Sequence, residues 1–384
     1  MLTDETRQFR SNVLTAFGAT GTQVEELLAY NDNIFHHNDQ TDVDLPLEDE
    51  PFVAAWERYL VAAETDGALA ALRGPIVQLN FPIRTAISHD PSYRAIVRRG
   101  QPVNACPWAT GLPFNRPEKI TFLLHPTPGG RIPVIIVGDR DDFENVVRAT
   151  TMRNEPGSVP RSIGAKMVAG FNNWERIWDY QRQWLEREDV QSGSADWAKE
   201  FKRLIQRKEL YQDRFIIVSE GPYSGVSANT LGLTENEWNR LSLVIRLHHE
   251  GSHYFTKRLY GVMRNNLLDE LIADYMGITG AIGRYRADWF LHFMGIEAHQ
   301  TNRRGGRLEH YRGDPPLSSK AFPLLQSLAK AAAENLERAD IYLGSNRRTL
   351  RDRGLIISAL AHLTIEELAS ADAGARLHRI FGAS

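Results

Sequence analysis

The sequence predicts an α+β protein that is mainly helical and contains a small β-sheet. Short runs of β-branched residues are separated by turns rich in Pro and Gly, which is typical of strands. These strand candidates lie near residues 120–124, 132–137 and 214–219. From Thr234 onward the pattern is largely helical. We therefore expect an α/β N-terminal part, residues 1–210, and a mainly helical C-terminal part, residues 211–384, with a soft boundary near Tyr211.

Two helices are expected at the start of the chain. Thr3 can cap a helix that runs to about Phe17, and Thr22 can cap a second helix that begins at Gln23. The acidic stretch over residues 38–50 carries few structure signals, so we expect a loop there.

The middle of the chain mixes strands and helices. The first two strand candidates are separated by residues 126–130, which contain two Pro and two Gly and indicate a hairpin or two neighbouring strands. Asp141 can cap a helix over residues 142–150. Residues 174–211 are predicted to be mostly helical, with a break near Gly193.

The composition excludes several classes of protein. A hydrophobic content of 42% with 24% charged residues is that of a soluble globular protein. The formal net charge of -3 gives no electrostatic reason to expect a nucleic-acid or membrane-surface partner. No apolar run approaches the length of about 18 residues that a membrane helix needs. Since the N-terminus also lacks the long apolar core of a secretory signal, we expect a cytoplasmic protein.

The cysteine count limits the kind of metal site that the chain can build. The 384 residues include 12 His and one Cys, Cys106. A single Cys excludes an intrachain disulfide framework and zinc sites built on several cysteines of this chain. Any metal site must therefore be formed mainly by His and carboxylates.

One motif carries recognisable chemistry. Residues 234–237 form a capping box, and Trp238, Leu241 and Ile245 then recur at helical spacing. The same helix continues into an H-E-x-x-H motif that runs from His249 to His253. Histidines four residues apart project from one face of a helix and can bind one ion. The alternative is a surface helix that happens to carry three polar side chains.

The glutamate of the motif has a separate role in this chemistry. Glu250 points roughly 100° away from His249, so it lies near the ion without binding it. Zinc lowers the pKa of a bound water toward about 7, and Glu250 can take the proton that this water releases.

A second helix pattern offers the remaining groups. One face is apolar, with Leu267, Leu271, Tyr275 and Ile278. Glu270 and Asp274 are four residues apart beside that face, as they could be on any exposed helix. If this helix runs antiparallel to the first, Glu270 becomes the third ligand and the fourth position stays open. Asp274 then accepts the N–H of the other ring nitrogen of His249.

With these residues the sequence resembles the gluzincin class of zinc metallopeptidases, the thermolysin-like group. Their pattern is H-E-x-x-H on one helix and E-x-x-x-D on the next. The matching residues here are His249, Glu250, His253, Glu270 and Asp274. The resemblance covers about residues 234–280 and implies a zincin-like metal-binding part with one zinc ion, a general base in Glu250, and a peptide or amide substrate. Because 16 residues separate His253 from Glu270, fewer than we expect in that group, Asp269 and Asp274 remain alternative third ligands.

The resemblance also raises expectations about the surroundings of the site. It implies a substrate that lies along an edge strand before the metal helix, for which residues 215–219 are the candidate and a core strand is the alternative. The N-terminal part would form one wall of the cleft. An oxyanion needs a hydrogen-bond donor. The available donors are Tyr254, Tyr260, Arg246, His310 and Tyr311, of which we select His310 and Tyr311.

Three functions remain open at this point. The first is a zinc-dependent hydrolase, most simply a metallopeptidase or amidase. The second is a di-iron carboxylate oxidoreductase, because Glu250-x-x-His253 has the spacing of di-iron ligands, although the sequence has no second E-x-x-H. The third is a binding protein whose site is not catalytic. The oligomeric state is not predicted.

Overall fold

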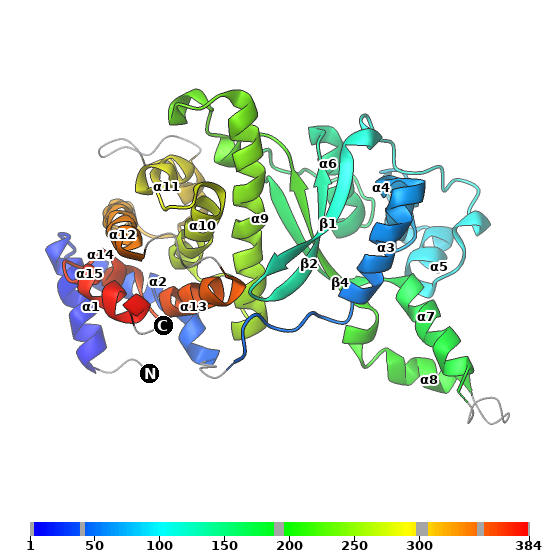
Figure 1. Cartoon of the computed structure of the whole chain (residues 1–384), viewed down its shortest axis with the longest axis horizontal. Coiled ribbons are helices and arrows are strands. Elements are labelled where there is room, and N and C mark those ends of the chain that lie inside the picture. Colours follow the sequence, from blue (N-terminus) through cyan, green and yellow to red (C-terminus); the bar gives the residue numbers. More distant parts are fainter. Residues whose placement is uncertain (1–3, 39–42, 188–195, 297–305, 344–348, 383–384) are drawn as a thin grey trace. The chain divides into compact units, whose positions relative to one another are not determined.

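The computed structural model of the chain describes residues 4–38, 43–187, 196–296, 306–343 and 349–382 (Figure 1). The fold is α+β and mainly helical, with one four-stranded mixed sheet among the described residues. This confirms the predicted fold class. None of the helices in the described ranges is both long and apolar enough to cross a membrane.

The chain divides into two compact units. Unit 1 comprises Met1–Glu48, Pro126–Gly130 and Pro222–Ser384, and unit 2 comprises Asp49–His125 and Arg131–Gly221. This division differs from a boundary near Tyr211, because the first 48 residues group with the C-terminal helices. A buried ion pair helps to explain the grouping. Arg10, near the N-terminus, lies 3.2 Å from Glu366, near the C-terminus, and both are almost fully buried.

The sheet has the strand order β1-β2-β4-β3. The strands are β1 (Ile120–Thr127), β2 (Gly130–Val137), β3 (Ala165–Asn172) and β4 (Gln212–Ser219). β2 pairs with β4 in parallel, and β3 pairs with β4 antiparallel. β2 and β4 are interior strands, which explains why both sequences are nearly continuous apolar runs. Of the two alternatives for residues 215–219, the edge strand is therefore wrong and the core strand is confirmed, since β4 has a neighbour on both sides.

Strand β3 was not expected from the sequence. It contains few β-branched residues, and its pairing with β4 is irregular between Ala169 and Phe171. Gly170, between them, has φ of +69°, a conformation that glycine adopts without steric penalty. A glycine inside a strand weakens the periodic signal, so only the pairing with β4 identifies this segment as a strand.

Unit 2 adds helices to the sheet. Its α-helices are α3 (Val53–Asp66), α4 (Ala68–Arg73), α5 (Pro91–Arg99), α6 (Arg140–Thr151), α7 (Trp174–Leu185) and α8 (Trp197–Leu204). The helix expected over residues 142–150 is present, but Asp139 caps it in place of Asp141 by accepting hydrogen bonds from the N–H groups of Asp141 and Asp142. The expected break near Gly193 falls outside the described residues.

Unit 1 is built from helices. They are α1 (Asp4–Ala16), α2 (Thr22–Tyr30), α9 (Glu235–Tyr260), α10 (Asn266–Ile282), α11 (Ala287–Met294), α12 (Phe322–Leu343), α13 (Leu350–Ala361), α14 (Ile365–Ala369) and α15 (Ala373–Gly382). Both N-terminal helices are present as expected. Gly21 occupies the N-cap position of α2, so Thr22 is its first residue and not its cap. Thr3 lies outside the described residues.

Helices α9 and α10 are the antiparallel pair that the sequence predicts. Along α10, Asp269 faces His253, Asp274 faces His249 and Gly277 faces Ile245, so the partners on α9 run in the opposite direction. A Cβ atom at Gly277 would lie 3.0 Å from the carbonyl oxygen of Ile245. The absence of a side chain at residue 277 therefore lets the two backbones approach closely.

The apolar faces predicted for this helix pair are buried. The seven residues concerned are each at most 5% exposed: Trp238, Leu241, Ile245, Leu267, Leu271, Tyr275 and Ile278. They belong to the main hydrophobic core of unit 1.

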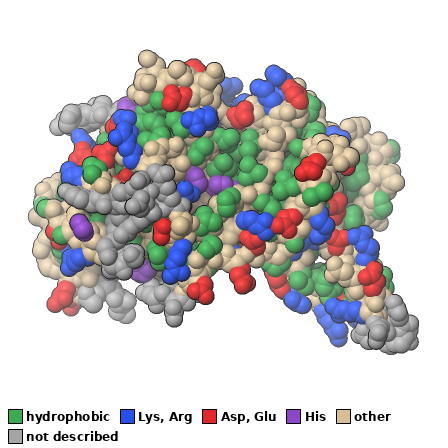
Figure 2. Space-filling view, viewed as in Figure 1, with side chains coloured by type: hydrophobic (Ala, Val, Ile, Leu, Met, Phe, Trp, Pro, Cys, Tyr) green, Lys and Arg blue, Asp and Glu red, His purple; other side chains and the backbone are tan. Residues whose placement is uncertain are grey.

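On the face of the molecule drawn in Figure 2, the described Lys and Arg side chains are interspersed with Asp and Glu.

Candidate metal centre

Helix α9 places both histidines of the motif on one face. The hydroxyl of Thr234 accepts a hydrogen bond from the N–H of Glu237, and Gly261 ends the helix with a left-handed φ of 75°. Within this 26-residue helix, His249 and His253 are buried, and their Nε2 atoms lie 3.0 Å apart. Two imidazole nitrogens thus point toward the same position.

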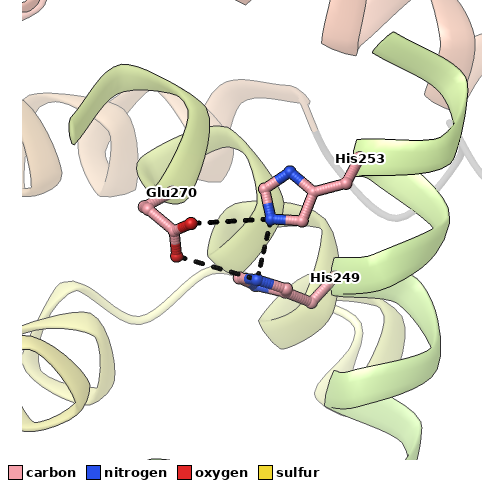
Figure 3. Close-up of side chains that lie close together, drawn as sticks. All are labelled: His249, His253 and Glu270. Carbon is pink, nitrogen blue, oxygen red and sulfur yellow. Dashed lines mark hydrogen bonds and ion pairs between the residues drawn. The ribbon is translucent and has the colours of Figure 1, made fainter. Parts of the chain in front are cut away.

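Helix α10 brings a carboxylate to the two imidazoles. Glu270 Oε2 lies 3.7 Å from His249 Nε2, and Glu270 Oε1 lies 3.6 Å from His253 Nε2 (Figure 3). In a tetrahedral site with zinc–ligand distances near 2.0–2.1 Å, ligand atoms lie roughly 3.3 Å apart. The two imidazole nitrogens and the nearer carboxylate oxygens are separated by 3.0–3.7 Å, so the three side chains lie close enough together to hold one ion.

Each of the three ligand side chains is held by a further residue. His249 Nδ1 lies 2.9 Å from Asp274 Oδ1, and His253 Nδ1 lies 3.1 Å from Asp269 Oδ2. Glu270 Oε2 lies 3.3 Å from the guanidinium of Arg307. Such partners fix the orientation of metal ligands and are a common feature of metal sites. Asp274 has the position that the sequence predicts. Asp269 faces Nδ1 of His253, on the far side of the ring, whereas Glu270 faces the Nε2 atoms of both histidines. Glu270 is therefore the carboxylate placed as a third ligand.

Two residues from outside the helix pair complete the cluster. Tyr223, in the 3₁₀ turn η8 (Tyr223–Gly225), hydrogen-bonds with both His249 and Asp274. Arg307, in η10 (Arg307–Tyr311), forms ion pairs with Asp274 and, at 3.3 Å, with Glu270. Sequence reasoning missed both residues as members of this cluster. No local pattern marks either residue.

The remaining candidate residues are dispersed. Glu250 is half-buried on α9, and its charge acts on His253. His310 is exposed, unlike its neighbour Tyr311. Arg246 donates a hydrogen bond to the carbonyl of Pro222. Tyr254 and Tyr260 are buried in unit 1, where Tyr254 lies beneath the guanidinium of Arg258 and Tyr260 packs against Phe35.

The charges of the cluster favour a divalent cation. Asp269, Glu270 and Asp274 are buried, and Arg307 is the cation that pairs with two of them. Burial opposes ionisation of Glu270 and Asp274, but the guanidinium of Arg307 outweighs it and lowers the pKa of both carboxyls. Burial raises the pKa of Asp269. The buried carboxyls still outnumber the one guanidinium among them, and a divalent cation beside the imidazoles would offset the excess negative charge.

The metal-free cluster holds a proton where an ion would bind. Burial disfavours a charged imidazole, but the carboxylates of Asp269 and Glu270 overcome it and raise the pKa of His253 to about 10. His253 is therefore protonated at neutral pH and must lose that proton to bind a metal. We expect zinc affinity to increase about tenfold per pH unit between pH 6 and 8, with release of at least one proton.

Calorimetry in two buffers of different ionisation enthalpy measures this proton release. Zinc binding that is independent of pH over this range, with no proton released, would contradict the expectation.

The geometry also bears on the di-iron alternative. Among the described residues, His249, His253 and Glu270 are the one group of at least three potential ligands whose atoms lie close enough to hold an ion. Glu250, which a di-iron site would use with His253, is not a member of this group. The arrangement thus offers two histidines and one carboxylate as potential ligands of a single ion.

Comparison with known proteins identifies a family. A family model with the description "Family of unknown function (DUF7005)" matches residues 12–372. The search of curated proteins and the search of solved structures each found no match.

Proposed function

The chain belongs to this family of unknown function (DUF7005), and we propose that it is a zinc-dependent hydrolase that cleaves amide bonds, as metallopeptidases and amidases do. The arrangement of His249, His253 and Glu270 carries the proposal. Their ligand atoms are separated by 3.0–3.7 Å, and each side chain has a hydrogen-bonding or ion-pair partner: Asp274 for His249, Asp269 for His253 and Arg307 for Glu270. A chance cluster of polar residues has no reason to satisfy both conditions together.

The residues divide into a set that binds the ion and a residue that moves a proton. His249, His253 and Glu270 would hold zinc, which supplies an activated water and polarises the substrate carbonyl. Glu250 follows His249 on the same helix and is half-buried, as an acid–base residue at the rim of such a site would be. Its carboxylate would accept the proton of the attacking water and deliver it to the leaving amine.

Tyr311 is the better of the two oxyanion donors considered. Tyr311 is half-buried and lies close enough for the charge of Glu270 to raise its pKa, whereas His310 is exposed. Burial, reinforced by the charge of Glu270, raises the pKa of Tyr311 far above neutrality, so the phenol keeps its proton. A protonated phenol beside the metal can donate to negative charge that develops on the substrate oxygen.

Metal content is the first test of the proposal. We expect the purified chain to contain one zinc, and His249→Ala to remove most of it. His248→Ala is the matched control, because the adjacent His248 contacts Arg353 at 3.2 Å and is not part of the metal group. Elemental analysis gives the result. Two irons per chain would favour the di-iron oxidoreductase, and a chain that binds no metal would contradict both metal-based functions.

Turnover is the second part of the same test. Libraries of quenched peptides, simple amides and esters are incubated with the zinc-loaded chain, with the chain treated with a chelator, and with the chain reloaded with zinc. Hydrolysis that disappears with the chelator and returns with zinc supports the proposal. A zinc-loaded chain that hydrolyses none of these substrates would favour a binding protein with a non-catalytic site.

A further inference from the structure

Tyr223 is fixed beside the metal group by several contacts of its own turn. Its backbone N–H donates a hydrogen bond to the Ser242 hydroxyl at 3.0 Å. Arg246 donates to the carbonyl of the preceding residue, Pro222, at 2.9 Å. The indole of Trp238 donates to the carbonyl of Val226 at 2.7 Å. All three partners belong to α9, so the turn is attached to the helix that carries the two histidines.

The phenol oxygen of Tyr223 lies at the centre of a hydrogen-bond network. It donates to Asp274 Oδ1 at 2.7 Å and receives an N–H of Arg307 at 2.9 Å. It also lies 2.9 Å from His249 Nδ1, the ring nitrogen that faces away from the metal position. Tyr223 is only 5% exposed, so water does not compete freely for these bonds. The phenol thus connects a metal ligand, its carboxylate partner and the Arg307 cation.

The direction of these bonds determines which nitrogen of His249 is free. A phenol has a single proton, and here Asp274 accepts it. The remaining face of the phenol oxygen can then only accept a hydrogen bond from His249 Nδ1, and Asp274 Oδ1 also accepts at 2.9 Å. Two acceptors at Nδ1 require a proton on that nitrogen. The neutral ring consequently leaves the lone pair of Nε2 directed at the metal position.

The opposite direction of the phenol proton would give the other tautomer of His249. If the phenol proton pointed at Nδ1 instead, the ring proton would sit on Nε2, between His249 and His253, and would block the metal position. Arg307 forms an ion pair with Asp274 and also donates an N–H to the phenol oxygen, so the phenol proton is directed toward the carboxylate.

We propose that Tyr223 is a positioning residue that locks His249 in the tautomer able to bind the metal. This inference rests on the metal site of the proposed function and adds a residue that the H-E-x-x-H and E-x-x-x-D motifs do not contain. Its role is to orient Asp274 and His249, and it does not touch the substrate.

The test compares two tyrosines that are matched in burial and bonding. Tyr223→Phe removes a phenol that donates to Asp274 at 2.7 Å, and Tyr275→Phe removes a phenol that donates to Asp340 at the same distance. Both tyrosines are at most 5% exposed, and Tyr275 follows Asp274 directly on α10. Zn²⁺ and Co²⁺ affinities are measured by competition with a chelator, and the Co²⁺ complex by its visible absorption.

Loss of a partner behind a metal ligand typically weakens metal binding by 10–100-fold. We expect Tyr223→Phe to weaken both ions by about this factor and to change the Co²⁺ spectrum, whereas Tyr275→Phe should stay within about threefold and keep the spectrum. If Tyr223 had only a structural role, both variants would melt at a lower temperature. Their metal affinities and Co²⁺ spectra would then equal those of the wild-type chain.

The outcomes distinguish failure of the role of Tyr223 from failure of the proposed function. Tyr223→Phe that binds both ions as tightly as the wild-type chain, with an unchanged Co²⁺ spectrum, overturns the role of Tyr223 and leaves the proposed zinc hydrolase intact. A wild-type chain that binds neither ion overturns both proposals. Equal losses of affinity in the two variants also overturn the specific role, because the phenol of Tyr275 donates to Asp340 and not to Asp274.

Discussion

Replacing Glu250 with Gln is expected to lower kcat for amide hydrolysis by about 10²–10⁴-fold while the chain retains one zinc. The amide of Gln has nearly the shape of the carboxylate but cannot accept and return a proton. Glu250 is absent from the group of potential ligands, so its replacement should leave the affinity for zinc nearly unchanged. Turnover number, zinc content and melting temperature of the variant are measured together.

A second glutamate on the same helix provides the control for Glu250. Glu237→Gln changes a carboxylate in the exposed first turn of α9 and should leave both turnover and zinc content unchanged. Turnover of Glu250→Gln within tenfold of the wild-type rate would refute the acid–base role. Loss of zinc from the same variant would instead identify Glu250 as a ligand, as the di-iron alternative requires.

The ligand set could be predicted because its geometry is local to two helices. His249 and His253 are one turn apart, as are Glu270 and Asp274, so the helical repeat alone places each pair on one face. The helical repeat does not show whether the polar faces of the two helices lie against each other. The apolar stripes on both helices and the short connection favour an antiparallel pair, which the structure contains.

The partners of these ligands could not be predicted in the same way. Tyr223 is 26 residues from His249, and Arg307 is 33 residues from Asp274. Their approach depends on how two turns dock against the helices, and a sequence pattern does not encode that. Asp269 illustrates a subtler limit. It precedes Glu270 by one residue and points in another direction, so only the crossing of α9 and α10 shows that it faces His253.

The fold shows the same contrast between local and distant information. The interior strands β2 and β4 were visible as apolar runs, but their sheet order was not, so an edge position and a core position both stayed open for β4. The grouping of the N-terminal helices with the C-terminal ones was likewise invisible, because the ion pair between Arg10 and Glu366 spans 356 residues. A contact of that separation leaves no periodic signal in the sequence.

Breaking the ion pair between Arg10 and Glu366 is expected to lower the stability of unit 1 strongly. Arg10 donates hydrogen bonds to the carbonyls of Leu28 and Asn31 as well as to Glu366, and burial raises the pKa of Glu366 despite the Arg10 charge. Arg10→Met would leave the carboxyl of Glu366 buried without its cation. Removal of one partner from a buried pair typically costs about 3–5 kcal/mol. For a unit of this size we expect the melting temperature to fall by roughly 6–20 °C.

Two further measurements give this prediction a sharp control. Replacing both residues together, Arg10→Met with Glu366→Leu, removes both charges at once, so the double variant should melt above Arg10→Met alone. Because the ion pair and the metal group both belong to unit 1, added zinc should raise the melting temperature of the same transition that Arg10→Met lowers. If zinc shifts one transition and Arg10→Met shifts another, then the N-terminal helices and the metal group do not unfold as one unit.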